Sequence, residues 1–229
     1  MNSTRDRILA AAQRLFSERG VKTSTLKMVT EEAGVNLAAV NYHFGTKEGL
    51  TAAIFDGLAE RISRRRLQLL HECEARAGGK PLPVEDIVYV FLEPYVLHEG
   101  GRDGALLINM LLHERVTPTP VIGTIVAKYF DRIATEFVRA FSASLPHLDA
   151  KTLYWRYYLM VSSILFSGSE RGQGNRLARI SGGNADLSDL NELAQQLTVF
   201  IAGGMAAPIN GPIVKAPKLD EPAATPRQH

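Results

Sequence analysis

The side chains best suited to chemistry in this sequence lie in the short segment 37–44, which reads LAAVNYHF. Small residues in its first turn would let a helix approach the edges of DNA bases closely. Asn41 can make the paired hydrogen bonds that recognise adenine, and the aromatic pair after it can reach phosphates or a thymine methyl group. The segment predicts six contacts to DNA: Leu37, Ala38, Ala39, Asn41, Tyr42 and His43.

Hydroxyl groups and lysines flank this segment on both sides. Thr25 and Thr46 each stand where a helix begins, and free amide groups at a helix N-terminus suit phosphate binding. Lys22, Lys27 and Lys47 add positive charge along the same approach. We therefore expect these five residues to contact the DNA backbone.

Three short helices must position these groups. Apolar residues at helical spacing predict a first helix that ends at Gly20, a second over 26–33 and a third over 37–44. Gly34 supplies the left-handed conformation that a tight turn between helices needs. Asn36 occupies the N-cap position of the third helix, and we also count it among the DNA-binding candidates.

The remainder of the sequence is also helical, with strand signals almost absent. A long fourth helix is expected from Thr46 to about residue 77, followed by a break at ARAGGKPLP. The sequence thus predicts an all-α protein of about nine helices: an N-terminal helix-turn-helix domain over 1–50, a helical domain over 51–206 and a disordered, proline-rich tail over 207–229. The later helices are expected at about 84–98, 103–115, 119–144, 149–170 and 187–205.

Composition excludes several classes of function. The net charge of +2 means that positive charge for nucleic acid must be concentrated locally. A single cysteine, Cys73, excludes an internal disulfide, and without a second Cys/His cluster it predicts no metal site. The longest apolar run is too short to span a bilayer, so we expect a soluble, cytoplasmic protein.

The first fifty residues resemble the N-terminal domain of the TetR (tetracycline repressor) family. The resemblance implies a DNA-binding regulator in which Lys47 contacts the backbone and Tyr42 and His43 lie over phosphates. Thr30 and the shifted Asn41–Tyr42 pair depart from the family pattern, so we expect a base preference that differs from the family norm. The matching landmarks are Ile8, Ala11, Ala12, Leu15, Phe16, Gly20, Thr25, Val29, Ala33, Gly34, Val35, His43, Phe44, Lys47 and Leu50.

The same resemblance implies that the second domain binds a ligand and forms a homodimer on a palindromic operator. In the family, the last two helices pack against their copies in a second subunit. An alternative is that these helices bury one another within one chain. The apolar residues expected at the interface are Ile164, Leu165, Leu190, Leu193, Leu197, Phe200 and Ile201.

A small hydrophobic effector would need an apolar pocket with few polar groups. LYWRYYLMVSSILFSGS and VFIAGGMAAP resemble the fatty-acid-responsive branch of the family, which implies a long-chain fatty acid or acyl-CoA. An anionic head would need a cation, which Arg156, Arg171, Arg176 or Arg179 could supply. The candidate pocket residues, each of which could instead be ordinary core, are Phe91, Tyr95, Met110, His113, Phe130, Trp155 and Tyr158.

Two other classes of function remain as alternatives. A helical enzyme is remote, because GSERGQG follows no strand and neither His98-Glu99 nor His113-Glu114 continues to a second histidine four residues on. A DNA-binding regulator controlled by a protein partner, without a small-molecule effector, is compatible with the sequence. No cofactor is implied by any of these motifs.

Overall fold

The computed structural model describes residues 3–97, 101–169 and 175–208, and helices make up its regular structure. The all-α class is confirmed, and all nine predicted helices occur within this part of the chain. The elements are α1 (Thr4–Arg19), α2 (Leu26–Ala33), α3 (Leu37–Phe44), α4 (Lys47–Ala77), α5 (Val84–Val96), α6 (Arg102–Val116), α7 (Pro120–Val126), the π-helical turn η2 (Ala127–Asp131), α8 (Arg132–Ser144), α9 (Ala150–Ser169), α10 (Arg176–Ile180) and α11 (Leu190–Ala206).

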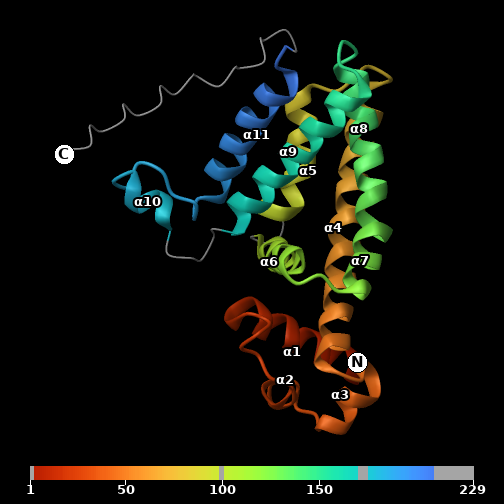
Figure 1. The fold of residues 1–229 in the computed structure, drawn as a ribbon, viewed down its shortest axis with the longest axis vertical. Coiled ribbons are helices and arrows are strands. Elements are labelled where there is room, and N and C mark those ends of the chain that lie inside the picture. The colour runs from red at the N-terminus through yellow and green to blue at the C-terminus, as the bar shows by residue number, and fades with distance from the viewer. Residues whose placement is uncertain (1–2, 98–100, 170–174, 209–229) are drawn as a thin grey trace, which may run out of the picture.

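The first three helices form a small head at one end of the molecule (Figure 1). Ile8 and Phe16 of α1, Val29 of α2 and Val40 of α3 are buried and form its core. Gly34 has φ of 62° and ψ of 44°, the left-handed conformation that the turn between α2 and α3 requires. This turn fixes the angle at which α3 leaves the head.

Helix α4 connects the head to the rest of the chain. Its 31 residues run from the head into the larger domain, with α7 and α8 alongside (Figure 1). Leu50, at its start, is buried with the head, whereas Leu58 and Leu70 are buried further along. The domain boundary predicted at residue 50 therefore falls inside a single continuous helix.

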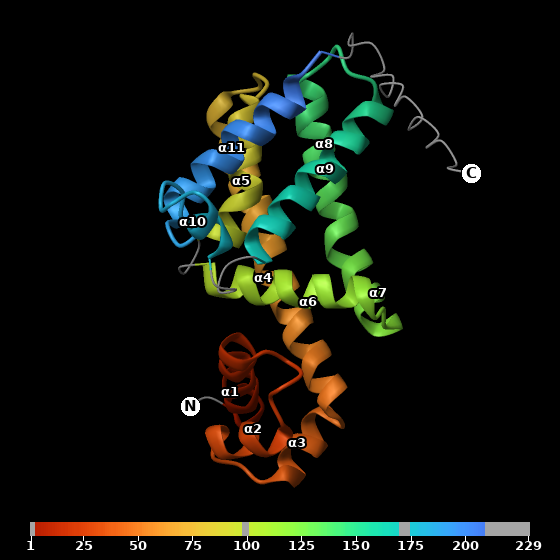
Figure 2. The same ribbon diagram turned by 60° about the vertical axis from the view of Figure 1, so that its left-hand side comes forward.

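The larger domain, which we call the body, is built around α5. Helix α11 packs on α5 and α9, and α8 packs on α9 (Figure 2). The predicted helix 119–144 is interrupted by η2, and α10 was not predicted. Most of the predicted tail, residues 209–229, lies outside the described residues.

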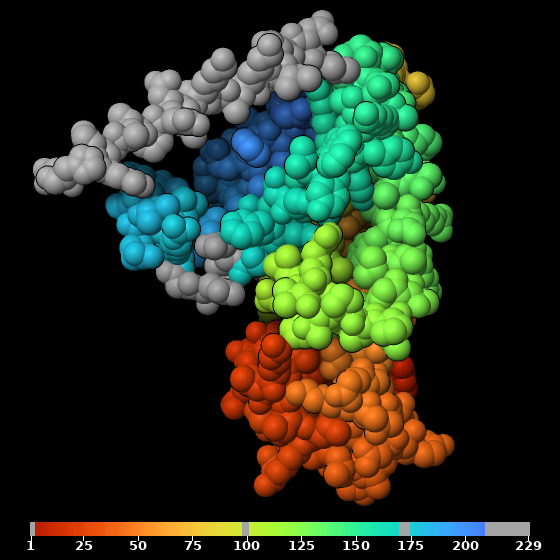
Figure 3. All heavy atoms as spheres, in the orientation of Figure 1, coloured from red at the N-terminus to blue at the C-terminus, as the bar shows by residue number. Residues whose placement is uncertain are grey.

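Helix α6 crosses the end of the body that faces the head (Figure 2). It lies very close to α5, because a Cβ atom added at Gly104 would be 2.1 Å from the carbonyl oxygen of Tyr95. On its other side α6 meets α1, and Figure 3 shows the head and α6 in direct contact. Helix α6 therefore contacts both α5 of the body and α1 of the head.

Candidate DNA-binding and effector sites

Helix α3 has one buried residue and a broad free face. Val40 is fully buried against the head, while all six residues predicted on this helix to contact DNA are exposed or partly exposed. Tyr42 is 86% exposed, the highest value among the large hydrophobic side chains that the structure describes. His43 is partly buried beside it, with their ring centroids 5.1 Å apart. The exposed set is Leu37, Ala38, Asn41 and Tyr42, with Ala39 and His43 partly exposed.

Three of the predicted DNA-binding residues are also helix caps. The side-chain oxygens of Thr25, Asn36 and Thr46 accept hydrogen bonds from the amides of Met28, Ala39 and Gly49, at 3.2, 2.9 and 3.1 Å. Each cap satisfies one free amide and leaves others of the first turn pointing outward. These caps therefore begin α2, α3 and α4 where the sequence predicted.

The lysines lie on the same end of the head. Lys22 and Lys27 are exposed, and the Lys47 ammonium donates to the Lys22 carbonyl at 3.4 Å. The next residue, Glu48, has its pKa lowered by a backbone hydrogen bond and by the Thr46 hydroxyl. Lys22 and Lys47 thus lie side by side at the start of α4, whereas Lys27 on α2 has the Glu31 carboxylate at 4.0 Å.

Two side chains that the sequence analysis did not single out hold α2 and α3 in place. The Arg7 guanidinium donates to the carbonyls of Ala33 and Gly34, at 2.6 and 2.8 Å. Buried Ser24 donates to the Leu15 carbonyl at 3.2 Å. Both side chains tie α1 to the segments around α2, so the orientation of α3 is fixed by hydrogen bonds as well as by its apolar core.

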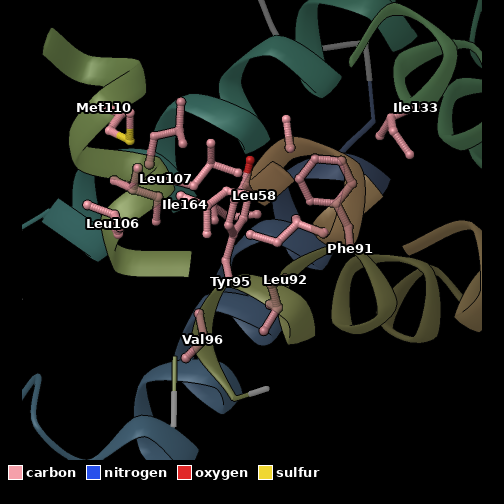
Figure 4. Close-up of a cluster of buried hydrophobic side chains, with 14 of the residues drawn as sticks. Leu58, Phe91, Leu92, Tyr95, Val96, Leu106, Leu107, Met110, Ile133 and Ile164 are labelled. Atoms are coloured by element: carbon pink, nitrogen blue, oxygen red, sulfur yellow. The ribbon is translucent and has the colours of Figure 1, made fainter. Parts of the chain in front are cut away.

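The structure brings three of the seven predicted effector residues together. Phe91, Tyr95 and Met110 are buried in one apolar cluster with residues of α4, α8 and α9 (Figure 4). Phe130 is partly buried against the same core. The other three lie outside it: His113, Trp155 and Tyr158 are exposed.

Trp155 and Tyr158 belong to a different feature. With Lys151 and Tyr154 they line an open hollow on the outer face of α9. They therefore cannot share one enclosed pocket with Phe91 and Tyr95. Their expected role as pocket residues is not supported by this placement.

The cation at the centre of the body is one that sequence reasoning missed. Arg66 of α4 is 1% exposed, and its guanidinium lies over the rings of Phe91 and Tyr95, at 3.8 and 3.9 Å from their centroids. Its Nε donates to the Phe91 carbonyl at 2.8 Å. Tyr157 packs on Phe91 in the same region, and burial raises its pKa, so its phenol stays neutral.

None of the described candidates for an anion-binding arginine lies in this cluster. Arg156 donates to the Met205 carbonyl and joins α9 to α11. Arg176 and Arg179 are exposed on α10. Arg171 lies outside the described residues.

Of the seven residues expected at the dimer interface, two are exposed or partly exposed and five are buried within the chain. Phe200 is 73% exposed, and Leu190 is partly exposed. The other five are buried within the chain, which agrees with the alternative that these helices bury one another. They therefore do not form a free surface on α9 or α11. These five are Ile164, Leu165, Leu193, Leu197 and Ile201.

Residues typical of metal sites are dispersed. Within the described ranges, no group of three or more His, Cys, Asp or Glu side chains comes together. Cys73 is partly buried and lies 3.2 Å from a guanidinium nitrogen of Arg76. No helix in the same ranges has the length and hydropathy needed to cross a membrane.

Two family profiles match the chain. The one described as "Bacterial regulatory proteins, tetR family" matches residues 8–54. The one described as "Tetracyclin repressor-like, C-terminal domain" matches residues 89–204, which is half of the chain. The two matches therefore fall on the head and on the body.

Curated relatives match the chain over part of their length. The transcriptional regulator AcrR of Shigella flexneri is 34% identical over 112 residues, 48% of this chain and 49% of the relative. TtgR of Pseudomonas putida is 44% identical over 57 residues, 25% of this chain and 27% of the relative. The chain thus aligns with about half or less of each of these two regulators.

Solved structures share the whole fold at low sequence identity. A transcriptional regulator from Rhodococcus has a TM-score of 0.66 at 17% identity, covering 90% of this chain and 99% of its own. The fatty acid degradation regulator FadR from Bacillus halodurans has a TM-score of 0.62 at 16% identity, covering 87% and 98%. At this identity the similarity establishes the arrangement of helices.

Proposed function

The chain belongs to the TetR family of bacterial regulatory proteins, and from this membership we propose that it is a transcriptional repressor whose operator binding is relieved by a small hydrophobic effector. The observation that carries the proposal is the free face of α3 beside the capped start of α4, at the end of the molecule opposite the apolar body. This family consists of regulators, which leaves no role for an enzymatic reaction.

The α3 face supports reading of the DNA major groove. Asn41 stands one turn after the small residues of the first turn, and its exposed amide can reach an adenine edge. Lys47 stands at the start of α4, where the helix dipole adds to its charge. Asn41 is therefore proposed as a residue that specifies sequence, and Lys47 as one that binds the backbone.

Two substitutions separate these roles. Asn41→Ala is expected to lower affinity for the operator by about 1–3 kcal/mol, with little loss on random DNA, because one base contact disappears. Lys47→Ala is expected to weaken binding to both DNAs alike and to reduce the salt dependence by about one contact. Fluorescence anisotropy at several salt concentrations measures both effects. An equal loss of operator and random DNA binding by Asn41→Ala would remove it from base reading.

A homodimer is proposed because one subunit offers one recognition helix, whereas a helix-turn-helix operator has two half-sites. The surface available for it is formed by exposed apolar residues at helical spacing on α9, together with the exposed side of α11. We call this the α9–α11 face; its residues are Trp155, Tyr158, Leu159, Phe166, Val199 and Phe200.

The effector is proposed to bind in the apolar cluster of the body. FadR of Bacillus halodurans is named for fatty acid degradation, and we extend that chemistry to this chain as a long-chain fatty acid or acyl-CoA. Binding there would displace α4 and α6, which alters the separation of the two recognition helices. Because half-site spacing is a rigid requirement, operator affinity then falls.

A polar link joins the head to the body at the point where this motion must pass. Asp103 of α6 accepts a hydrogen bond from Gln13 of α1 at 2.5 Å and pairs with Arg61 of α4 at 2.7 Å. One carboxylate thus connects the three helices that meet between head and body. Asp103 therefore links the body directly to α1 of the head.

Asp103→Asn is expected to weaken operator binding by about threefold to tenfold, an energy within the usual range for coupling between sites. The weakening arises because a loosened head must be ordered on DNA. Removing a negative charge would, by electrostatics alone, strengthen DNA binding, so the direction of the change is diagnostic. Operator titrations should include Arg115→Ala, an exposed position on the same helix, as the control. Tighter binding by Asp103→Asn would refute the link.

A further inference from the structure

We propose that buried Arg66 binds a carboxylate group of the effector, so that the ligand is an amphiphile with one acidic head and an apolar remainder. This inference rests on the proposed effector control and specifies the chemistry of that site. It assigns the anion-binding role to the centre of α4, a helix that runs directly into the head.

One nitrogen of the Arg66 guanidinium has no hydrogen-bond partner among the described residues. Its Nε donates to the Phe91 carbonyl, but its Nη2 is buried and has no hydrogen-bond partner among the described residues. Within the same ranges no carboxylate forms an ion pair with it. Arg65, the preceding residue, does pair with a carboxylate, that of Glu93 at 3.3 Å. The fold therefore supplies a counter-charge to the half-buried arginine and leaves the fully buried one without.

A cation that is buried without a counter-charge destabilises the fold. Removing a charge from water is costly even after the surrounding protein relaxes. Stacking on Phe91 and Tyr95 offsets part of this cost. An anion bound to the guanidinium would offset the rest of this desolvation cost. A carboxylate suits the planar arrangement of the guanidinium N–H groups.

A second donor stands one helical turn away. Ser63 is 4% exposed, and its hydroxyl has no hydrogen-bond partner in the part of the chain that the structure describes. Residues three apart on a helix are neighbours on one face. Arg66 and Ser63 together offer two unsatisfied donors on the inner side of α4, which matches the two oxygens of a carboxylate.

The surroundings determine the rest of the ligand. Figure 4 shows Phe91 and Tyr95 among aliphatic side chains from several helices, including Leu58, Leu107 and Ile164. These labelled side chains carry no charge. Arg65 and Glu93 each have one buried polar atom without a hydrogen-bond partner, but their charges already pair with each other. The cluster therefore favours a monocarboxylate whose remaining atoms are apolar.

The test compares acids with neutral analogues of the same shape on the full-length protein without DNA. Dodecanoate is measured against dodecanol, and 1-naphthoate against 1-naphthalenemethanol, by thermal shift and by calorimetric titration. At least one acid is expected to stabilise the protein and to bind about tenfold to a hundredfold more tightly than its alcohol, the value of one charged hydrogen bond. If neither acid is preferred over its alcohol, the proposal is wrong.

Variants assign the preference to Arg66. Arg66→Met approximates the length of the side chain and should abolish the preference for the acid. It should fold, since it removes a charge that is buried without an ion-pair partner in the described residues. Arg66→Lys retains the charge and should keep part of the preference, which provides a second measurement if Arg66→Met unfolds. Arg76→Met, an exposed position on the same helix, should bind as the unmodified protein does.

The outcomes separate this inference from the proposed function. Undiminished acid preference in Arg66→Met, or in Arg66→Lys where Arg66→Met unfolds, would overturn the role of Arg66. Operator binding measured on the same preparations reports on the regulator independently, because Arg66 lies several helical turns beyond Lys47 along α4. A protein that binds its operator but shows no acid preference would keep the proposed DNA-binding role and lose this inference alone.

Discussion

Phe91→Ala is expected to lower the free energy of unfolding by about 3–5 kcal/mol, the range found when a buried aromatic ring is removed from a core. Phe91 is 2% exposed and meets the rings of Phe137 and Tyr157 edge to face, with centroids 4.9 and 5.8 Å apart. Its ring also covers the Arg66 guanidinium. The substitution therefore leaves a cavity and removes one of the two rings that shield a buried charge.

Urea denaturation followed by circular dichroism measures this loss. Tyr89→Ala is the matched control, because Tyr89 lies on the same helix but is 46% exposed, and we expect it to cost less than about 1 kcal/mol. A similar loss for the two variants would show that α5 is not the centre of the core. Phe91→Ala should also reduce binding of the acids that Arg66 prefers, since the position of the guanidinium depends on this ring.

The fold could be predicted from the sequence because its signals are local. Apolar periodicity and glycine- or proline-rich breaks marked the long helices, and the caps expected at Thr25, Asn36 and Thr46 are formed. The two departures are both of a kind that periodicity does not register. The five residues of α10 are too few to show a helical repeat, and the π-helical turn η2 changes hydrogen bonding without breaking the apolar pattern.

The effector site could be predicted only in part, because burial of a charge depends on distant neighbours. Arg64, Arg65 and Arg66 are consecutive in the sequence, yet the first is exposed, the second half-buried and the third buried. A signal was present: Arg66 stands four residues from both Ile62 and Leu70, on the apolar side of α4. Which arginine finds a carboxylate is decided by the position of Glu93 on α5, which no local pattern contains.

The dimer face illustrates a related limit. The apolar stripe on α11 showed that Leu193, Leu197 and Ile201 would be buried, but not against which surface. They pack within the chain. The interface proposed now is the opposite side, where Phe200 projects and Gly203 and Gly204 leave open space beside it.

Phe200→Asp is accordingly expected to separate the proposed dimer into monomers and to weaken operator binding by about 10²–10⁴-fold. The reason is that two recognition helices joined in one dimer gain an effective concentration that separate subunits lack. An aspartate at the centre of an apolar interface must be buried without a partner, which costs several kcal/mol in each subunit. Because the side chain is 73% exposed in the single chain, the subunit itself should keep its stability.

Val116→Asp is the control for Phe200→Asp, since Val116 is also apolar and exposed, lies at the end of α6 and adds the same negative charge. Light scattering reports the mass of each variant, and anisotropy with a full palindrome and with a half-site reports DNA binding. Phe200→Asp should lose affinity for the palindrome and keep that for the half-site, whereas Val116→Asp should change neither by more than about threefold. A Phe200→Asp protein that remains dimeric would place the interface elsewhere. Equal losses of affinity for the palindrome and the half-site would mean that the added charge, and not the loss of the dimer, weakens DNA binding.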